Sequence, residues 1–265
     1  MKHEIDCRVV IRKNNIPGKE TETTGQKGKA ATRRDRTNLE KEKGINLIWS
    51  DNRQHLATVN LARGNSVYGE KLVLKEGSEF RLWDPFRSKL AAAIIKGLNV
   101  KLLPRSKILY LGASTGTTVS HISDIVGNSG QIFAIESSSR VARELIFNVS
   151  SKRQNITPII ADARKPREYF SIFDIIDIVY CDIAQPDQTV IAVENCVVYL
   201  KAGGILLLVI KTRSIDVTMD PRKVVKQEIR KLEQNSFSIL QTLCLNPFDK
   251  DHTMVHAIYN PKSSK

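Results

Sequence analysis

The sequence predicts an α/β protein in which helices cover both faces of a parallel sheet, preceded by a small antiparallel β subdomain. From about residue 103 onward, apolar runs of strand length alternate with segments of helical spacing. Before them, between 44 and 79, short alternating stretches are separated by turn residues. A tight turn from Gly112 to Gly116 joins the first apolar run of the α/β part to its first helical segment.

Composition restricts the class of protein further. The chain has 265 residues, 41% of them hydrophobic and 26% charged, as in ordinary soluble globular proteins. No apolar run approaches the roughly 20 residues of a membrane span, and residues 1–7 lack the apolar core of a signal peptide. The four cysteines are scattered, which argues against a zinc site or a disulfide framework and favours buried thiols. We therefore expect a protein of the cytoplasm, or of the nucleus if its source has one, without membrane contact and without a bound metal.

The charge balance is basic, with 41 Lys and Arg against 28 Asp and Glu and a net charge of +13. Such a field attracts phosphates, so a nucleic acid is the first partner to consider; an acidic protein partner is the alternative. Residues 1–43 hold 12 basic and 7 acidic residues with few large apolar ones, which predicts a disordered basic arm. The remaining chain keeps a net charge of +8, so the folded part is basic as well.

The β subdomain is predicted over 44–85, with strands near 45–49, 54–60 and 71–75. A helix is then predicted over 86–98, with the stretch Asp84 to Arg87 as its cap.

The main domain is predicted over 86–262. Its expected strands are 107–111, 131–135, 156–160, 176–181 and 205–210, and its expected helices are 117–126, 138–150, 187–200 and 221–235. Strands near 237–244 and 253–259 follow as an antiparallel hairpin at one edge of the sheet. Five parallel strands followed by such a hairpin are typical of class I methyltransferases, a Rossmann-like fold.

The turn after the first of these strands predicts a nucleotide site. A strand, a glycine turn and a helix bring backbone N–H groups and a helix N-terminus against a bound nucleotide. Glu136 follows Gly112 by 24 residues and ends the next strand. A carboxylate at that place can accept hydrogen bonds from both ribose hydroxyls of a nucleotide. The turn reads G-x-x-x-G, without the pyrophosphate fingerprint, which favours S-adenosylmethionine over NAD. Simple strand–helix packing is the alternative explanation of the turn.

Ligands of open α/β sheets bind beyond the carboxyl ends of the strands, and polar groups gather there in this sequence. They are Gly112 to Thr118, Glu136-Ser137, Asp162-Ala163, Asp182 to Gln185, and Lys211. The Asp162 carboxylate is expected to accept a hydrogen bond from an adenine amino group. Asp182 can bind the ammonium of the cofactor, the substrate hydroxyl, or both.

Asp182 and Lys211 form a candidate acid–base pair. A carboxylate can orient or accept the proton of a hydroxyl nucleophile, and a nearby lysine can lower the pKa of that hydroxyl. A salt bridge between neighbouring strand ends explains the pair equally well. Taken alone, Lys89 and His252 are better explained as a surface lysine and a turn residue. His121, His256, Tyr68 and Trp83 are interpreted as structural.

Several strings together resemble the fibrillarin family, the ribose 2′-O-methyltransferases of C/D-box guide ribonucleoproteins. They are Val67 to Glu70, Trp83 to Leu90, Leu109 to Ala113, Gly116 to Asp124, Asp162 to Arg164, Asp182 to Thr189, Ile210-Lys211, Ser214 to Thr218, and Asp251-His252. The resemblance implies methylation of rRNA or tRNA, with Lys89, Asp182, Lys211 and His252 as the catalytic set. It also implies S-adenosylmethionine contacts at Thr117, Thr118, Glu136, Ser137, Asp162, Ala163, Asp182, Ile183, Ala184 and Gln185.

The resemblance further implies partners: a C/D-box guide RNA with its target RNA, a Nop-domain scaffold protein and a kink-turn-binding protein. The chain departs from the family pattern at Ser137, where Phe is usual, and the turn reads Gly-Ala-Ser-Thr-Gly instead of Gly-Ala-Ala-Ser-Gly. The Arg/Gly-rich tail of eukaryotic members is absent, which resembles the archaeal branch. Two alternatives share the cofactor pocket: methylation of a protein glutamine, and a structural subunit without activity.

Overall fold

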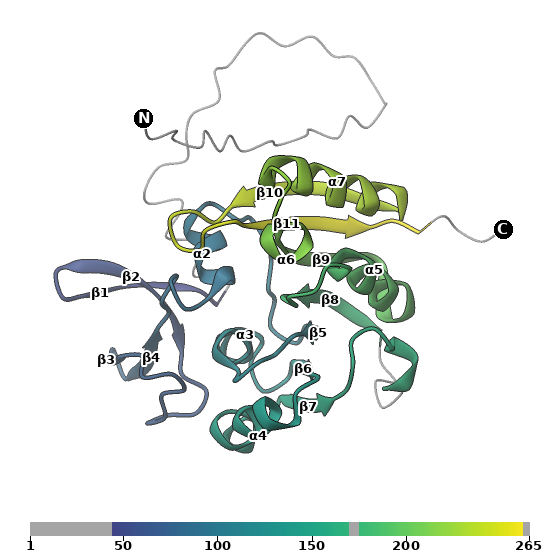
Figure 1. The fold of residues 1–265 in the computed structure, drawn as a ribbon. Helices are drawn as coiled ribbons and strands as arrows, with labels where there is room; N and C mark the ends of the chain where they lie inside the picture. Colours follow the sequence, from purple (N-terminus) through teal and green to yellow (C-terminus); the bar gives the residue numbers. More distant parts are fainter. Residues whose placement is uncertain (1–43, 170–174, 262–265) are drawn as a thin grey trace, which may run out of the picture.

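Two sheets organise the protein (Figure 1), whose computed structural model describes residues 44–169 and 175–261. The predicted basic arm over 1–43 lies outside the described residues. A four-stranded sheet comes first in the sequence, and a seven-stranded sheet contains all the later strands.

The first sheet is antiparallel throughout, in the order β1-β2-β4-β3. Its strands are β1 (Asn46–Ser50), β2 (Arg53–Val59), β3 (Leu72–Lys75) and β4 (Ser78–Leu82). The sequence predicted β1 to β3 as individual strands and missed β4. That strand has only five residues, and its apolar Phe80 and Leu82 alternate with charged ones. Its Arg81 is nevertheless fully buried, which the charge of the side chain does not predict.

The second sheet has the order β10-β11-β9-β8-β5-β6-β7. Its strands are β5 (Lys107–Leu111), β6 (Gln131–Glu136), β7 (Ile156–Ile160), β8 (Ile176–Cys181), β9 (Leu200–Lys211), β10 (Phe237–Cys244) and β11 (His252–Tyr259). Strands β5 to β9 pair in parallel, and β11 is antiparallel to both β9 and β10. The predicted fold class, five parallel strands followed by a hairpin, is therefore confirmed.

Helices cover both faces of this sheet. They are α2 (Lys89–Ile95), α3 (Thr117–Val126), α4 (Ser139–Asn148), α5 (Gln188–Tyr199), α6 (Thr212–Ile215) and α7 (Pro221–Gln234), with short 3₁₀ turns η1 (Ser150–Lys152) and η2 (Pro166–Glu168).

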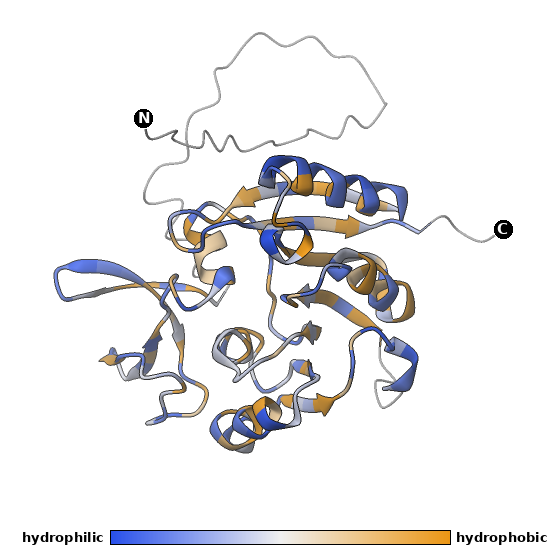
Figure 2. Cartoon of the chain, in the orientation of Figure 1, coloured by the Kyte–Doolittle hydropathy of each residue, from blue (hydrophilic) through white to orange (hydrophobic). Residues whose placement is uncertain are grey.

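Alternation along the strands divides the core in two. In β5, Ile108 and Tyr110 pack with α2, α3 and α4, whereas Leu109 and Leu111 pack with α5 and α7. Each fully buried side chain of this size contributes about 1.5–3 kcal/mol relative to leaving it exposed. Figure 2 shows the outward surface of α7 as hydrophilic, which matches a helix that buries one stripe only.

The predicted helix at 86–98 was three residues too long at each end, because α2 spans only Lys89–Ile95. The helix α2 begins at Lys89, and its N-cap is Ser88, whose side chain accepts from the backbone N–H of Ala91. Asp84, predicted to belong to the cap, instead accepts from the backbone N–H of Phe86 at 2.9 Å in a preceding turn. The shift matters because it makes Lys89 the first residue of the helix, one position after a side-chain cap.

Four buried charged side chains join the two sheets. The guanidinium of Arg81 in β4 contacts Glu70 at 2.6 Å and Asp124 of α3 at 2.9 Å, and Arg153 contacts Asp124 at 2.5 Å. All four side chains are at most 1% exposed. We call this group the junction cluster. Since α3 also starts at the glycine turn, the small sheet is fastened to the helix that borders the predicted nucleotide site.

None of the helices in the described ranges is both long enough and apolar enough to span a bilayer.

Candidate functional site

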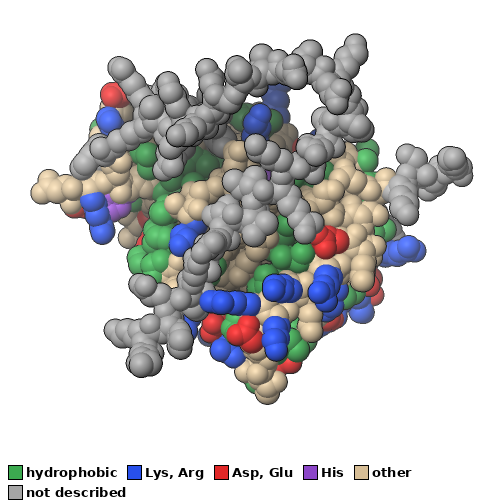
Figure 3. Space-filling view, turned by 90° about the horizontal axis from the view of Figure 1, so that it is seen from above, with side chains coloured by type: hydrophobic (Ala, Val, Ile, Leu, Met, Phe, Trp, Pro, Cys, Tyr) green, Lys and Arg blue, Asp and Glu red, His purple; other side chains and the backbone are tan. Residues whose placement is uncertain are grey.

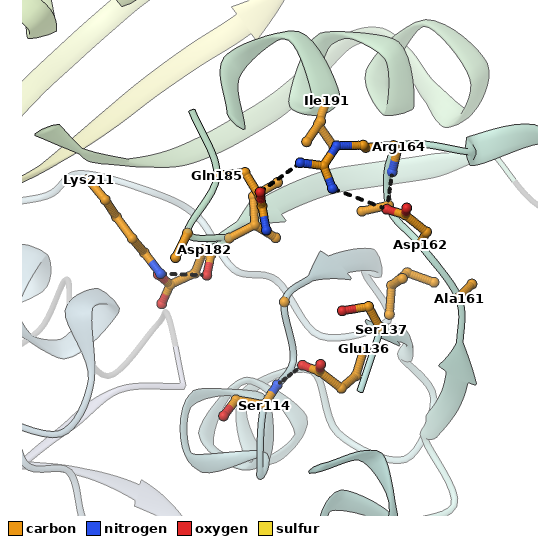
Figure 4. A pocket seen from close by; sticks show the side chains of 15 residues that line it. Ser114, Glu136, Ser137, Ala161, Asp162, Arg164, Asp182, Gln185, Ile191 and Lys211 are labelled. Carbon is orange, nitrogen blue, oxygen red and sulfur yellow. Dashed lines mark hydrogen bonds and ion pairs between the residues drawn. The ribbon is translucent and has the colours of Figure 1, made fainter. Parts of the chain in front are cut away.

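A pocket of about 230 Å³ opens at the carboxyl ends of β5, β6, β7 and β8 (Figure 4). The residues that line it are Gly112, Ser114, Ile135, Glu136, Ser137, Ala161, Asp162, Ala163, Arg164, Asp182, Ile183, Ala184, Gln185, Ile191 and Lys211. The pocket thus collects residues from each of the strand ends that the sequence singled out, as expected for an open α/β sheet.

The turn after β5 needs its two glycines for different reasons. Gly112 has φ +81, and a Cβ there would lie 2.9 Å from the backbone oxygen of Asp182. Gly116 has φ +93, and a Cβ there would lie 2.7 Å from Leu145 and Val149 side-chain atoms. The first glycine lets the chain pass close to the end of β8, and the second lets α3 start against α4. The turn therefore serves packing as well as forming the pocket wall.

Glu136 presents a fixed carboxylate to the pocket. One oxygen accepts from the backbone N–H of Ser114 and the other from that of Ser138, both at 2.9 Å. Each oxygen keeps a further lone pair. The carboxylate can therefore accept two additional hydrogen bonds from a ligand, which is what a pair of ribose hydroxyls offers.

Arg164 forms one wall of the pocket, and sequence reasoning did not predict it as a site residue. Its guanidinium contacts Asp187 at 3.1 Å and donates to the Gln185 side chain at 2.7 Å, and Figure 4 shows it between Gln185 and Asp162. The hydrogen bond from Arg164 lowers the pKa of Asp187, and the same contact raises the pKa of Arg164. In the sequence, the role of Arg164 in the pocket wall was indicated only by the string Asp162 to Arg164, which is part of the family resemblance.

Asp182 and Lys211 meet at the pocket edge. Lys211 Nζ lies 2.8 Å from Asp182 Oδ1 and donates to the Asp182 backbone oxygen at 2.9 Å. Lys89 Nζ lies 3.3 Å from Asp182 Oδ2, on the opposite oxygen. Each of the three side chains is 12–22% exposed, so the group is shielded but reachable from the solvent. One carboxylate is thus flanked by two ammonium groups.

His252, at the start of β11, joins this group through a residue that the sequence did not single out. His252 Nδ1 lies 2.8 Å from Asp249 Oδ1, and Lys89 Nζ lies 3.6 Å from Asp249 Oδ2. The structure therefore brings together all four predicted catalytic residues, Lys89, Asp182, Lys211 and His252, with Asp249 between two of them. Only the spacing Asp-x-x-His in the final turn hinted at Asp249.

Gln188 is a third residue, after Arg164 and Asp249, that the sequence did not single out. Its side-chain oxygen accepts from the backbone N–H of Lys211 at 3.0 Å, and the residue is fully buried. This contact holds the end of β9 against the start of α5 and so fixes the lysine next to Asp182.

The predicted cofactor residues Thr117 and Thr118 start α3 but do not line the pocket. The Thr118 hydroxyl is buried and lies 2.9 Å from the Ser88 hydroxyl. Through this pair the start of α3 is linked to the cap of α2, which carries Lys89.

Four buried side chains of reactive types are unsuited to chemistry. Burial raises the pKa of the Cys181 thiol to about 12, and it raises the pKa values of Tyr110 and Tyr180 well above the usual range. His121 is fully buried as well, and burial holds its pKa well below 6.5. These groups stay neutral and serve the core. Among the residues that the structure describes, no three His, Cys, Asp or Glu side chains are grouped to hold a metal ion.

The doubly wound sheet with its added antiparallel β11, the glycine turn after β5 and the acids after β6 and β7 define the class I methyltransferase fold.

Comparisons with known proteins narrow this class. The family model described as Fibrillarin matches residues 37–261. The chain is 50% identical over 212 residues to the fibrillarin-like rRNA/tRNA 2′-O-methyltransferase of Saccharolobus islandicus, covering 80% of this chain and 91% of that protein. The chain belongs to the fibrillarin family.

Solved structures of fibrillarins are similar to this chain as well. The structure of Aeropyrum pernix fibrillarin in complex with natively bound S-adenosyl-L-methionine has a TM-score of 0.75 and 44% identity, over 81% of this chain and 94% of that one. The structure of a fibrillarin/Nop5p complex has a TM-score of 0.74 and 39% identity, over 83% and 98%.

Proposed function

We propose that this protein transfers a methyl group from S-adenosylmethionine to a ribose 2′-hydroxyl of rRNA or tRNA. The observation that carries the proposal is the placement of Asp182 between Lys211 and Lys89, at 2.8 and 3.3 Å, on the edge of the pocket. The relatives named rRNA/tRNA 2′-O-methyltransferases support the reaction class.

The pocket fits the proposed cofactor. Glu136 offers two oxygens to the ribose hydroxyls, Asp162 is available to the adenine amino group, and Asp182 faces the end where the ammonium and the sulfonium would lie. Ser137, Ala163, Ile183, Ala184 and Gln185 complete the proposed binding wall. Thr117 and Thr118, which start α3 outside the pocket lining, are proposed to act on the cofactor through the position of that helix. When bound, the cofactor supplies the electrophilic methyl carbon.

Lys211 and Asp182 are proposed to activate the nucleophile. The 2′-hydroxyl donates a hydrogen bond to the Asp182 carboxylate, and the Lys211 ammonium lowers the pKa of that hydroxyl through its charge. Asp182 would accept the hydroxyl proton as the methyl carbon exchanges its bond to the sulfonium sulfur for a bond to the ribose oxygen, which leaves a neutral thioether. Lys89 and His252 position the hydroxyl and the cofactor, and ordered approach supplies much of the remaining rate.

The partners that we propose are those that membership of the fibrillarin family implies. The structure of a relative in complex with Nop5p supports a Nop-domain scaffold protein. A C/D-box guide RNA would select the target RNA, and a kink-turn-binding protein would join the particle through that RNA. The relatives are archaeal, so we propose the cytoplasm as the compartment.

Surface charge supports RNA as the substrate. The outer side of α7 exposes Arg222, Lys223, Lys226 and Arg230, and Figure 3 shows Lys and Arg side chains gathered on the upper face, where α7 lies in Figure 1. Such a surface binds phosphates without reading bases, so sequence choice would be left to the guide.

Radiolabelled methyl transfer tests the proposal. The chain is incubated with labelled S-adenosylmethionine and a target RNA, with the scaffold proteins and guide RNA present or omitted in turn. Label on the ribose opposite the guide, found only in the complete mixture, is the expected result. Label on a glutamine of an added protein, without any need for guide RNA, would favour a protein methyltransferase. Absence of cofactor binding would leave a structural subunit.

A further inference from the structure

We propose that Asp249 is a positioning residue of the methyl-transfer centre, where its carboxylate holds Lys89 and His252 in place. The inference rests on the proposed function of the site. It begins from the contacts of Asp249, one oxygen 2.8 Å from His252 Nδ1 and the other 3.6 Å from Lys89 Nζ.

The Lys89 ammonium lies between two carboxylates. Its ammonium lies 3.3 Å from Asp182 and 3.6 Å from Asp249, whereas Lys211 makes a full contact with Asp182 at 2.8 Å. The attractions of Asp182 and Asp249 for the Lys89 ammonium oppose each other, because each carboxylate draws the ammonium away from the other carboxylate. Without the Asp249 charge, Lys89 closes onto Asp182 Oδ2. It then occupies the oxygen that is available to the ribose hydroxyl.

Asp249 also restricts the His252 ring. Nδ1 faces two acceptors, the Asp249 carboxylate and the backbone oxygen of Lys250 at 2.7 Å. A ring nitrogen between two acceptors carries the proton, so in the neutral ring Nε2 is the acceptor. That tautomer lets Nε2 accept a hydrogen bond from a substrate group.

The formal charges of the side chains at the pocket edge sum to zero. Two ammonium groups, Lys89 and Lys211, face two carboxylates, Asp182 and Asp249. A balanced site can admit the sulfonium cation of the cofactor.

The loop that carries Asp249 is held by contacts independent of its carboxylate. Phe248 packs edge-to-face on Phe86 with ring centroids 5.1 Å apart, and Lys96 of α2 donates to the backbone oxygen of Asn246 at 3.0 Å. The partners of Asp249, Lys89 and His252, are each 22% exposed, so replacement of Asp249 leaves no fully buried charge behind. A variant at Asp249 therefore keeps the loop docked and tests the carboxylate alone.

The first test is steady-state kinetics in the complete guided particle. We expect Asp249→Asn to lower kcat by about 10²-fold, as for misplacement of a catalytic group by about 1 Å, while KM for S-adenosylmethionine changes little because Asp249 does not line the pocket. Asp249→Glu should restore most of the rate, since it returns the carboxylate.

Asp251→Asn is the matched control. It removes the same charge from the same loop, but Asp251 pairs with Arg213, at 3.3 Å, and not with Lys89. We expect a rate close to that of the unmodified chain. Equal losses in Asp249→Asn and Asp251→Asn, or a loss that Asp249→Glu does not repair, would overturn the proposal.

A crystal structure of Asp249→Asn separates this proposal from the proposed function. We expect Lys89 Nζ to move from 3.3 Å to full contact with Asp182, about 2.7–2.9 Å. An unmoved Lys89 overturns the positioning role even if the chain methylates RNA. A moved Lys89 in a chain that never methylates RNA supports the geometry and rejects the function.

Discussion

Two clusters of alternating charges in the described part of the chain, the junction cluster and the cluster at the pocket edge, differ in both cation and burial. The junction cluster uses Arg81 and Arg153 against Glu70 and Asp124, at 2.5–2.9 Å and with side chains at most 1% exposed. The cluster at the pocket edge uses Lys89 and Lys211 against carboxylates, with side chains 12–31% exposed and two contacts longer than 3 Å.

The difference separates charges that hold the structure from charges that carry out chemistry. A guanidinium presents five donors in a rigid fork, and Arg81 uses it to contact Glu70, Asp124 and Ser120 at once. An ammonium on a flexible stem can move between acceptors when a substrate arrives. We therefore expect changes in the junction cluster to affect the free energy of unfolding, and changes at the pocket edge to affect turnover.

The largest effect is expected at Asp182 and Lys211. Asp182→Ala or Lys211→Ala should lower methyl transfer by roughly 10²–10⁴-fold, because each removes a group that acts on the proton of the hydroxyl. The free energy of unfolding should change little, since both side chains keep some solvent contact. Single-turnover transfer and urea denaturation of the same preparations measure the two quantities.

Lys201→Ala is the control for this pair. It removes the 2.5 Å contact with Asp177 at the opposite end of β8. Both its turnover and its unfolding should match the unmodified chain. Unmodified turnover in either pocket variant would reject the proposed mechanism.

Arg81→Met should cost about 3–5 kcal/mol of unfolding free energy, because it leaves Glu70 and Asp124 as buried charges without their shared partner. Lys71→Met, which breaks an ion pair with 52% and 64% exposed side chains, should cost less than about 1 kcal/mol. Similar losses in the two variants would show that burial does not distinguish these contacts.

A pH titration of stability tests His121, which lies against the junction cluster. Tyr68 and Thr58 contact its two ring nitrogens, each at 2.8 Å, and burial keeps its pKa well below 6.5. The unfolded chain therefore binds the extra proton. Stability from this group is complete above pH 6.5 and falls as the pH drops below it, by at most about 1.4 kcal/mol per unit.

His121→Gln should remove this part of the pH dependence. Burial alone would raise the pKa of Glu70, but the charge of Arg81 and two backbone N–H groups bring it below 4.5, so its contribution is lost only at more acidic pH. A pH profile between 6.5 and 4.5 that is the same in both chains would contradict the assignment.

The smallest effect is expected at Ser137. Ser137→Phe would place an aromatic ring in the pocket wall, where stacking on an adenine is worth about 1–3 kcal/mol. Titration calorimetry with S-adenosylmethionine should show tighter binding with an unchanged kcat. Ser137→Thr, which adds no ring, is the control, and equal affinities in all three chains would show that the side chain at this position does not reach the adenine.

The parts of the fold that follow simple periodicity could be predicted from the sequence. The bounds of β5, β7, β8, β10 and α3 agree with the predicted ranges, because an apolar run or helical spacing covers each one. β4 was missed because only two apolar residues, Phe80 and Leu82, alternate with charged ones in it, and the burial of its Arg81 depends on a partner 43 positions away. No local pattern contains such a partner.

The same reason limits prediction of the site. Glu136 and Asp182 end apolar strands, so their place beyond the sheet follows from the alternation. Lys89 and His252 depend on the docking of α2 and of the final turn against that edge, which only the resemblance could supply. Asp249 was missed because its two partners are a histidine close in sequence and a lysine 160 positions away.

The position of β11 has a consequence for synthesis of the protein. This strand pairs with β9 along its whole length and brings His252 opposite Lys211. A ribosome that has released α2 and the first five strands of the second sheet has exposed Lys89, Asp182 and Lys211, but the histidine and Asp249 are still to come. A chain that ends before β11 therefore lacks both His252 and Asp249, and we expect methyl transfer only once this strand is inserted.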